Sequence, residues 1–172
     1  RKVEELFDQY EQEKEGDEDA RRKLAGTICA ELRVHMQLEE ELFYPWLHEH
    51  LEDDDMELVE EAQVEHNSAK DLIEQIEGAT EIDDEYNAKV KVLGEYIKHH
   101  VGEEENEIFP KVSEDQEELD ELGQEMGSRK SELAAEMGLD QETSGEEEDA
   151  ESGEAATSPR SSRRQESTRR SH

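Results

Sequence analysis

The feature that most constrains the fold is a motif that occurs twice. Residues 35–45 read HMQLEEELFYP, and residues 100–110 read HVGEEENEIFP. Each copy has a histidine, two adjacent glutamates starting four residues later, and an aromatic residue followed by proline. Because side chains four residues apart lie on the same face of an α-helix, each copy predicts a helix that presents an imidazole and a carboxylate together. The two pairs are His35 with Glu39 and His100 with Glu104.

Apolar residues recur at helical spacing through the first 137 residues, and five helices account for them. Breaks are expected at Gly16 and Gly78, a kink or an end is expected at Pro45, and an end is expected at Pro110. Ser113 is a candidate N-cap of the last helix, and Gly138 is its candidate end. The expected helices cover about 1–15, 18–44, 55–77, 83–109 and 114–137.

Long helices with short connections predict an all-α fold: an up-down antiparallel four-helix bundle with an additional C-terminal helix. We assign residues 1–138 to this domain. Residues 139–172 contain almost no large apolar side chains, so we expect them to form a disordered, charged tail. This tail is acidic at first and rich in arginine at its end. It is either solubilising or a contact for an acidic surface.

The third helix carries His66 on its apolar stripe, between Ala62 and Ala69. The two His-Glu pairs lie on similar stripes, so all five polar groups should face the core. Burying an ionised carboxylate without a partner costs on the order of several kcal/mol, and a bound metal ion removes that cost. Bundle cores commonly house two-metal sites of this composition. We therefore predict a metal site, and its ligands are His35, Glu39, His66, His100 and Glu104.

The chain also contains a longer internal repeat. The third helix aligns with the first when residues 72–73 are placed on residues 6–7. The bundle then consists of two similar helix hairpins, each with one lone histidine and one His-Glu pair. The counterpart of His66 falls one residue before Arg1. We therefore expect a histidine immediately upstream of Arg1 as a sixth ligand.

These motifs resemble the hemerythrin-like, HHE cation-binding domains over roughly residues 1–110. The segment LGQEMGSRKSEL is similar to the extra helix that follows the bundle in many bacterial members. The resemblance implies a non-haem di-iron centre. By position, the bridging carboxylates would be Glu39 and Glu104, and the terminal ligands would be His35, His66 and His100.

The chain departs from the oxygen-carrying members at Lys70. Those members have a second histidine one turn after the histidine of the third helix, and a protonated lysine cannot ligate a metal. The resemblance therefore implies a more open, asymmetric iron rather than reversible oxygen carriage.

Together these features predict a protein that binds two iron ions, with manganese and zinc as competitors, because imidazole and carboxylate ligands suit these metals. Oxygen, peroxide or nitric oxide could bind at an open coordination position. The expected role is sensing, scavenging or iron handling in a reducing cytoplasm. The sequence shows no substrate-shaping loops, so we do not predict turnover; an oxidase-like enzyme is one alternative. Another is a metal-free helical structural or interaction protein whose charged tail is its active part.

Composition narrows the possible partners. The net charge is −33, from 52 acidic and 19 basic residues, and such a field repels nucleic acid and anionic membranes. No apolar run approaches the roughly 18–20 residues that a membrane-spanning helix needs. The single cysteine, Cys29, excludes an intramolecular disulfide, and its apolar neighbours predict a buried thiol. The acidity also fits the solvated surface of a halophilic protein.

Other polar and aromatic residues lie close to the motifs. His99 points about 100° away from the second motif's histidine, so we expect it at the surface or in a supporting position. Glu40 and Glu105 repeat beside the predicted ligands and are candidate hydrogen-bond acceptors or alternative ligands. We expect His48 and His50 to be exposed. The aromatic residues expected in core or bundle-end packing are Tyr44, Trp46, Tyr96 and Phe109.

Overall fold

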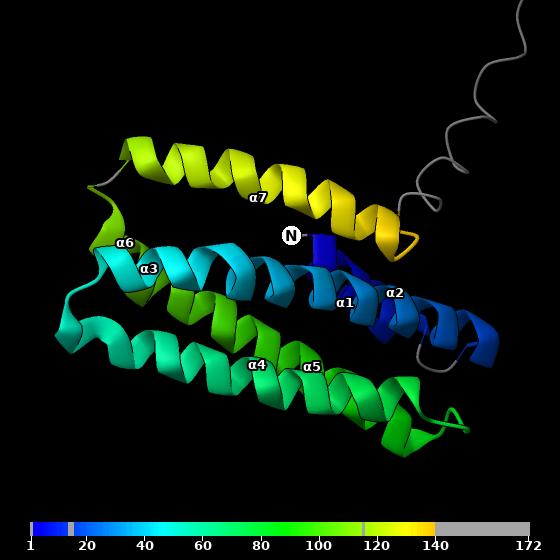
Figure 1. Cartoon of the computed structure of the whole chain (residues 1–172). Coiled ribbons are helices and arrows are strands. Elements are labelled where there is room, and N and C mark those ends of the chain that lie inside the picture. Colours follow the sequence, from blue (N-terminus) through cyan, green and yellow to red (C-terminus); the bar gives the residue numbers. More distant parts are fainter. Residues whose placement is uncertain (1, 14–15, 115, 140–172) are drawn as a thin grey trace, which may run out of the picture.

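The computed structural model describes residues 2–13, 16–114 and 116–139, and within these ranges it contains helices and no strand (Figure 1). The predicted all-α class is therefore confirmed. The elements are α1 (Lys2–Glu13), α2 (Glu18–Leu38), η1 (Glu39–Phe43), α3 (Tyr44–His50), η2 (Asp53–Asp55), α4 (Met56–Glu77), α5 (Asp84–Glu103), η3 (Glu104–Ile108), α6 (Phe109–Val112) and α7 (Gln116–Glu136). Of these, η1 and η3 are π-helical and η2 is a 3₁₀ turn.

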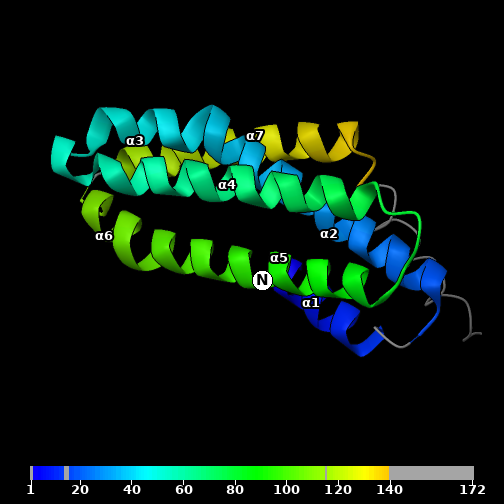
Figure 2. The same cartoon turned by 90° about the horizontal axis from the view of Figure 1, so that it is seen from below.

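The long helices lie side by side (Figures 1 and 2). In both views α4 and α5 are neighbours that run in opposite directions, joined by the short connection at residues 78–83. Helix α2 packs against α4, and α1 packs against α2 and α5. Helix α7 lies along α2 on the far side from α4 and α5 (Figure 1). The interior between α2, α4 and α5 is where the predicted ligands meet.

Two aspartates fix the starts of the helices that carry the motifs. The Asp17 carboxylate accepts a hydrogen bond from the Ala20 N–H at 3.2 Å at the start of α2. Asp83 accepts one from the Tyr86 N–H at 2.9 Å at the start of α5. Such an N-cap stabilises a helix by about 1 kcal/mol. Gly78 follows the last residue of α4, as predicted.

Two apolar clusters fill the interior, one on each side of the motifs. The first joins α1, α2, α4 and α5, and it includes Leu32, Ala69 and Ile97. The second lies toward the other end, and it includes Phe43, Ala62 and Ile108. The motif histidines and glutamates lie between these positions along each helix. A polar centre is therefore enclosed between two apolar layers.

Neither proline ends its helix. The end predicted at Pro110 is therefore wrong, and of the two outcomes predicted at Pro45, a kink or an end, the end is excluded. The chain continues in helical conformation past Pro45 to His50, and past Pro110 to Val112. In each case the preceding turn widens into a π-helix, in which the Tyr44 N–H donates to the Glu39 carbonyl, five residues back. The Phe109 N–H likewise donates to the Glu104 carbonyl. Since proline lacks an N–H and crowds the carbonyl four residues earlier, the wider turn accommodates it without a break.

Helix α7 ends as predicted at Gly138, which has a φ of +74°. The Leu139 N–H donates to the Ala134 carbonyl at 2.9 Å, and the Gly138 N–H donates to the Ala135 carbonyl at 3.2 Å. These two bonds form a Schellman motif. Ser113 follows the last residue of α6 in helical conformation, and its hydroxyl donates to the Pro110 carbonyl at 3.0 Å.

Cys29 is fully buried, as predicted. Within residues 2–13, 16–114 and 116–139, none of the helices is long and apolar enough to cross a bilayer. Apart from Leu139, the predicted tail lies outside the described residues. So does the position upstream of Arg1.

Candidate metal centre

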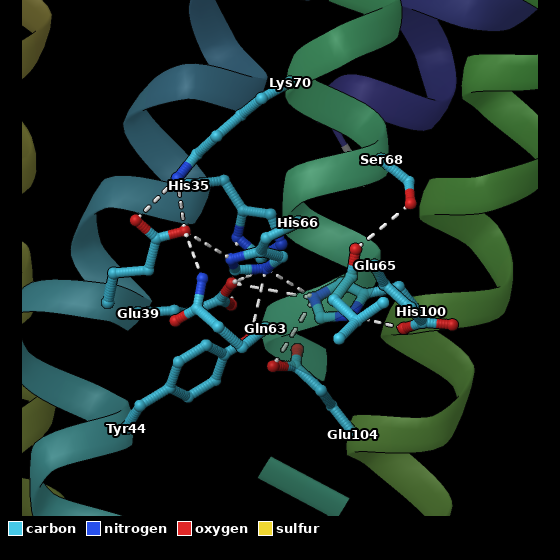
Figure 3. A network of polar contacts seen from close by, with 12 residues as sticks. His35, Glu39, Tyr44, Gln63, Glu65, His66, Ser68, Lys70, His100 and Glu104 are labelled. Carbon is cyan, nitrogen blue, oxygen red and sulfur yellow. Dashed lines mark hydrogen bonds and ion pairs between the residues drawn. The ribbon is translucent and has the colours of Figure 1, made fainter. Parts of the chain in front are cut away.

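The structure brings the five predicted ligands together inside the bundle. His35 and Glu39 come from the junction of α2 and η1, and His66 comes from the middle of α4. The remaining two, His100 and Glu104, come from the junction of α5 and η3. Figure 3 shows these side chains pointing toward a common centre. Four of them each offer a ligand atom within 4.8 Å of the others: His35, Glu39, His100 and Glu104.

Glu39 is the central member of the group, since it lies beside an imidazole from each of three helices. Its Oε1 is 3.1 Å from His35 Nδ1, and its Oε2 is 3.2 Å from His66 Nε2 and 3.7 Å from His100 Nε2. The Nε2 atoms of His66 and His100 are 3.0 Å apart. Glu104 Oε1 lies 3.6 Å from His100 Nε2. His66 therefore joins the group through Glu39 and His100.

The donor atoms fit a metal ion. Glu39, His66, His100 and Glu104 are all buried, and the side chain of His35 is 32% exposed. Three buried polar atoms in the centre have no hydrogen-bond partner: His35 Nε2, Glu39 Oε2 and Glu104 Oε1. Buried polar atoms in proteins are nearly always hydrogen-bonded, so three such atoms in one place call for a ligand. Imidazole nitrogens and carboxylate oxygens are the donors that iron, manganese and zinc accept.

Two further carboxylates orient the buried imidazoles. His66 Nδ1 lies 3.0 Å from Glu40 Oε1, and His100 Nδ1 lies 3.0 Å from Glu65 Oε2. A carboxylate can only accept, so each Nδ1 carries a proton and each Nε2 faces the centre. This is the usual arrangement of a metal-binding histidine, in which the second nitrogen donates to a carboxylate.

Lys70 completes the arrangement around His66. Its ammonium donates to both oxygens of Glu40, at 2.6 and 2.7 Å. Figure 3 shows the Lys70 side chain extending from α4 toward the centre. Glu40 thus serves as an acceptor, which is one of the two roles predicted for it. The prediction for Glu105 is not matched, because its side chain is exposed.

The titration properties reflect the crowding of charges. Burial raises the pKa of Glu104, and the negative charge of Glu39 raises it further. Burial also acts to raise the pKa of Glu39, but the contacts from His100 and His66 outweigh it and lower that pKa. Burial acts to lower the pKa of His100, but Glu39 and Glu104 raise it. In the metal-free protein a protonated imidazole therefore supplies the positive charge that a bound cation could replace.

Tyr44 belongs to the centre and not only to the core, where we expected it. Its hydroxyl lies 3.0 Å from His66 Nε2, and the two rings are 5.3 Å apart. Because Tyr44 is one residue before Pro45, the direction of its side chain depends on the π turn of η1. Burial and the charge of Glu39 raise its pKa, so the hydroxyl keeps its proton and can donate a hydrogen bond at the centre.

Other expectations had mixed outcomes. His99 is at the surface and His48 is exposed, as predicted. The prediction for His50 was wrong, because its ring stacks on Trp46 at 3.9 Å and contacts Glu118 of α7. Tyr96 was expected in core or bundle-end packing but is 47% exposed. Phe109 is also exposed, although it packs on Phe43.

Sequence reasoning missed Glu65. It precedes His66 by one residue and so lies off the apolar stripe, which drew attention away from it. The only available signal was the acidic residue beside a predicted ligand. Its actual partner is a histidine from another helix, and no local pattern indicates that contact.

The geometry agrees with the comparison to known proteins. The family model described as the hemerythrin HHE cation binding domain matches residues 1–112, which include all five predicted ligands. Neither a curated protein nor a solved structure matches the chain. The matched segment covers well over half of the sequence and ends at the last residue of α6. The chain therefore belongs to the hemerythrin HHE cation-binding domain family.

Proposed function

We propose that this protein binds two iron ions in the centre between α2, α4 and α5. Membership of a cation-binding family supports a metal ion, and three imidazoles with two carboxylates favour iron, with manganese and zinc as competitors. The single observation that carries the proposal is the convergence of three buried donor atoms without hydrogen bonds.

Each residue has a distinct part in this proposal. Glu39 of η1 and Glu104 of η3 would hold the ions through their carboxylates, and the family resemblance implies that they would be the bridging ligands. The terminal ligands would be the three histidines: His35, His66 and His100. We propose that an up-down antiparallel four-helix bundle holds these ligands. The alternating directions of α2, α4 and α5 support this topology (Figure 1).

An iron pair supplies reversible redox chemistry and an open position for a small ligand such as oxygen, peroxide or nitric oxide. The chain itself keeps most of the centre dry, since four of the five ligands are buried. Glu40 and Lys70 hold His66 in place, and Tyr44 offers a proton donor beside it. We propose sensing, scavenging or iron handling in the cytoplasm as the role.

The test is reconstitution of the full chain with ferrous iron, followed by elemental analysis and a near-ultraviolet absorption spectrum. We expect two irons per chain and a higher melting temperature, because a ligand that binds only the folded state stabilises it. His100→Ala should abolish both effects, whereas His48→Ala, at an exposed position, should change neither. If the chain retains no iron and its melting temperature does not change when iron is added, the result would instead support the alternative of a metal-free interaction protein.

A further inference from the structure

A second group of ligating side chains lies at the surface, beside the buried centre. We call it the rim cluster, and it consists of Glu65, His99 and Glu103. Each offers one ligand atom, and these atoms lie within 4.8 Å of one another. His99 Nε2 is 3.1 Å from Glu103 Oε1 and 3.7 Å from Glu65 Oε1. The His99 side chain is 65% exposed, so a solvated cation can reach it directly.

Glu65 belongs to both groups. Its Oε2 lies 3.0 Å from His100 Nδ1 of the buried centre, and its Oε1 faces His99 of the rim cluster. Figure 3 shows Glu65 extending from α4 beside His100. One carboxylate thus connects the outer histidine to the inner one.

A cavity of about 220 Å³ is lined by residues of both groups. It lies between α4 and α5, and its wall includes buried His66 and His100 together with His99 and the exposed side chains of Val64 and Tyr96. A water molecule occupies about 30 Å³ in the liquid, so the cavity has room for a small cation that keeps some of its waters. Two members of the rim cluster, Glu65 and His99, therefore line the same cavity as two of the buried imidazoles.

The charge of the rim cluster favours a cation. Glu65 Oε1 and Glu103 Oε1 both face His99 Nε2, at 3.7 and 3.1 Å, so two carboxylates converge on one imidazole. Two negative charges this close repel one another. A divalent cation coordinated by the three side chains would offset this repulsion, because it brings two positive charges to the same place.

We propose that Glu65, His99 and Glu103 bind a divalent cation beside the α4–α5 cavity, as a transit site for ions on their way to the buried centre. One imidazole and two carboxylates make an incomplete ligand set for zinc or a similar ion, and water fills the remaining positions. Such a site holds its ion weakly. Weak, exposed binding suits transit, because the ion must also leave.

The site itself is tested by titrating the full chain with Zn²⁺ while following the imidazole NMR signal of His99, which is assigned by its loss in His99→Ala. We expect a saturable shift of that signal. Glu103→Gln should weaken the binding at least tenfold, the loss found when even a supporting residue of a metal site is removed. Glu105→Gln makes the same charge change at an exposed position two residues away and should leave the affinity within about twofold.

Two outcomes would overturn the site. One is a His99 signal that does not respond to Zn²⁺. The other is equal weakening by the two glutamine variants, because the attraction would then be a diffuse field and not coordination.

The transit role rests on the proposed function, and it is tested by the rate at which Co²⁺ enters the buried centre, followed by visible absorption. His99→Ala should slow this uptake several-fold without changing the final amount bound, whereas His48→Ala should not. Equal rates in the two variants would overturn the role. If the wild-type centre takes up no Co²⁺, the proposed function fails, and the Zn²⁺ titration of His99 still decides the rim site.

Discussion

Replacing Glu104 by glutamine should stabilise the metal-free protein while weakening its metal binding. Glu104 is 4% exposed, its Oε1 makes no hydrogen bond, and its pKa is raised by burial and by Glu39. The folded, metal-free chain therefore either buries a charge or takes up a proton. Glutamine has the shape of the protonated side chain and needs no proton, so it avoids this cost.

The magnitude follows from the cost of protonation. An unperturbed glutamate has a pKa of about 4.3, and each pH unit above it adds about 1.36 kcal/mol, so protonating Glu104 at pH 7 costs at most about 4 kcal/mol. The contact of 3.6 Å with His100 recovers part of this. We expect Glu104→Gln to raise the free energy of unfolding in EDTA by about 2 kcal/mol, or roughly 4–8 °C in melting temperature.

Added metal should reverse the order of stability. At a free Mn²⁺ concentration of about 100 times its dissociation constant the wild type gains about 2.7 kcal/mol, whereas the variant gains much less. Paired thermal melts in EDTA and in excess Mn²⁺ measure both effects, with Glu105→Gln as the control. A Glu104→Gln protein that is less stable than wild type in EDTA, or that gains as much from Mn²⁺, would refute the idea that Glu104 is kept for a cation.

Three further predictions concern other parts of the molecule. Burial raises the pKa of Cys29 from 9.0 to about 12, so the native thiol keeps a proton that the unfolded chain loses. Stability should fall by up to about 1.4 kcal/mol per pH unit above pH 9, and urea titrations should show a shallower fall in Cys29→Ala. Lys70→Met frees Glu40 from its bidentate contact and should weaken Mn²⁺ binding about 10- to 100-fold by calorimetry. Gly138→Ala should cost about 1–2 kcal/mol in thermal melts because φ is positive there, whereas Gly123→Ala, inside α7 with open space around it, should cost nothing.

Much of the candidate centre could be predicted because its signals are local. A histidine and a glutamate four residues apart share a face of a helix. Predicting that His35 and Glu39 lie together therefore required only a correct helix prediction. His66 was found because it interrupts an apolar stripe between Ala62 and Ala69, and a stripe shows which face is inward. That these side chains converge is a property of the structure, whereas their role as ligands stays a prediction.

The parts that could not be predicted depend on contacts between helices. Glu65 is explained only by His100 of α5, and His50 only by Glu118 of α7 and by the ring of Trp46. These partners are far apart in sequence, so neither periodicity nor composition indicates them. The prolines were misjudged for another reason: their rule assumes a regular α-helix, and the chain widens the turn instead.

The widened turns at η1 and η3 have a consequence for redesign of this protein. A π turn holds one residue more than an α turn, so each motif in effect carries a single-residue insertion just after its glutamate. Deleting one residue from η1 would restore regular winding, but it would rotate Phe43 and Tyr44 by about 100° relative to Glu39. The rings of Phe43 and Tyr44 would then point away from the Glu39 carboxylate. Length in these five-residue segments is therefore less tolerant of change than the identity of their exposed side chains.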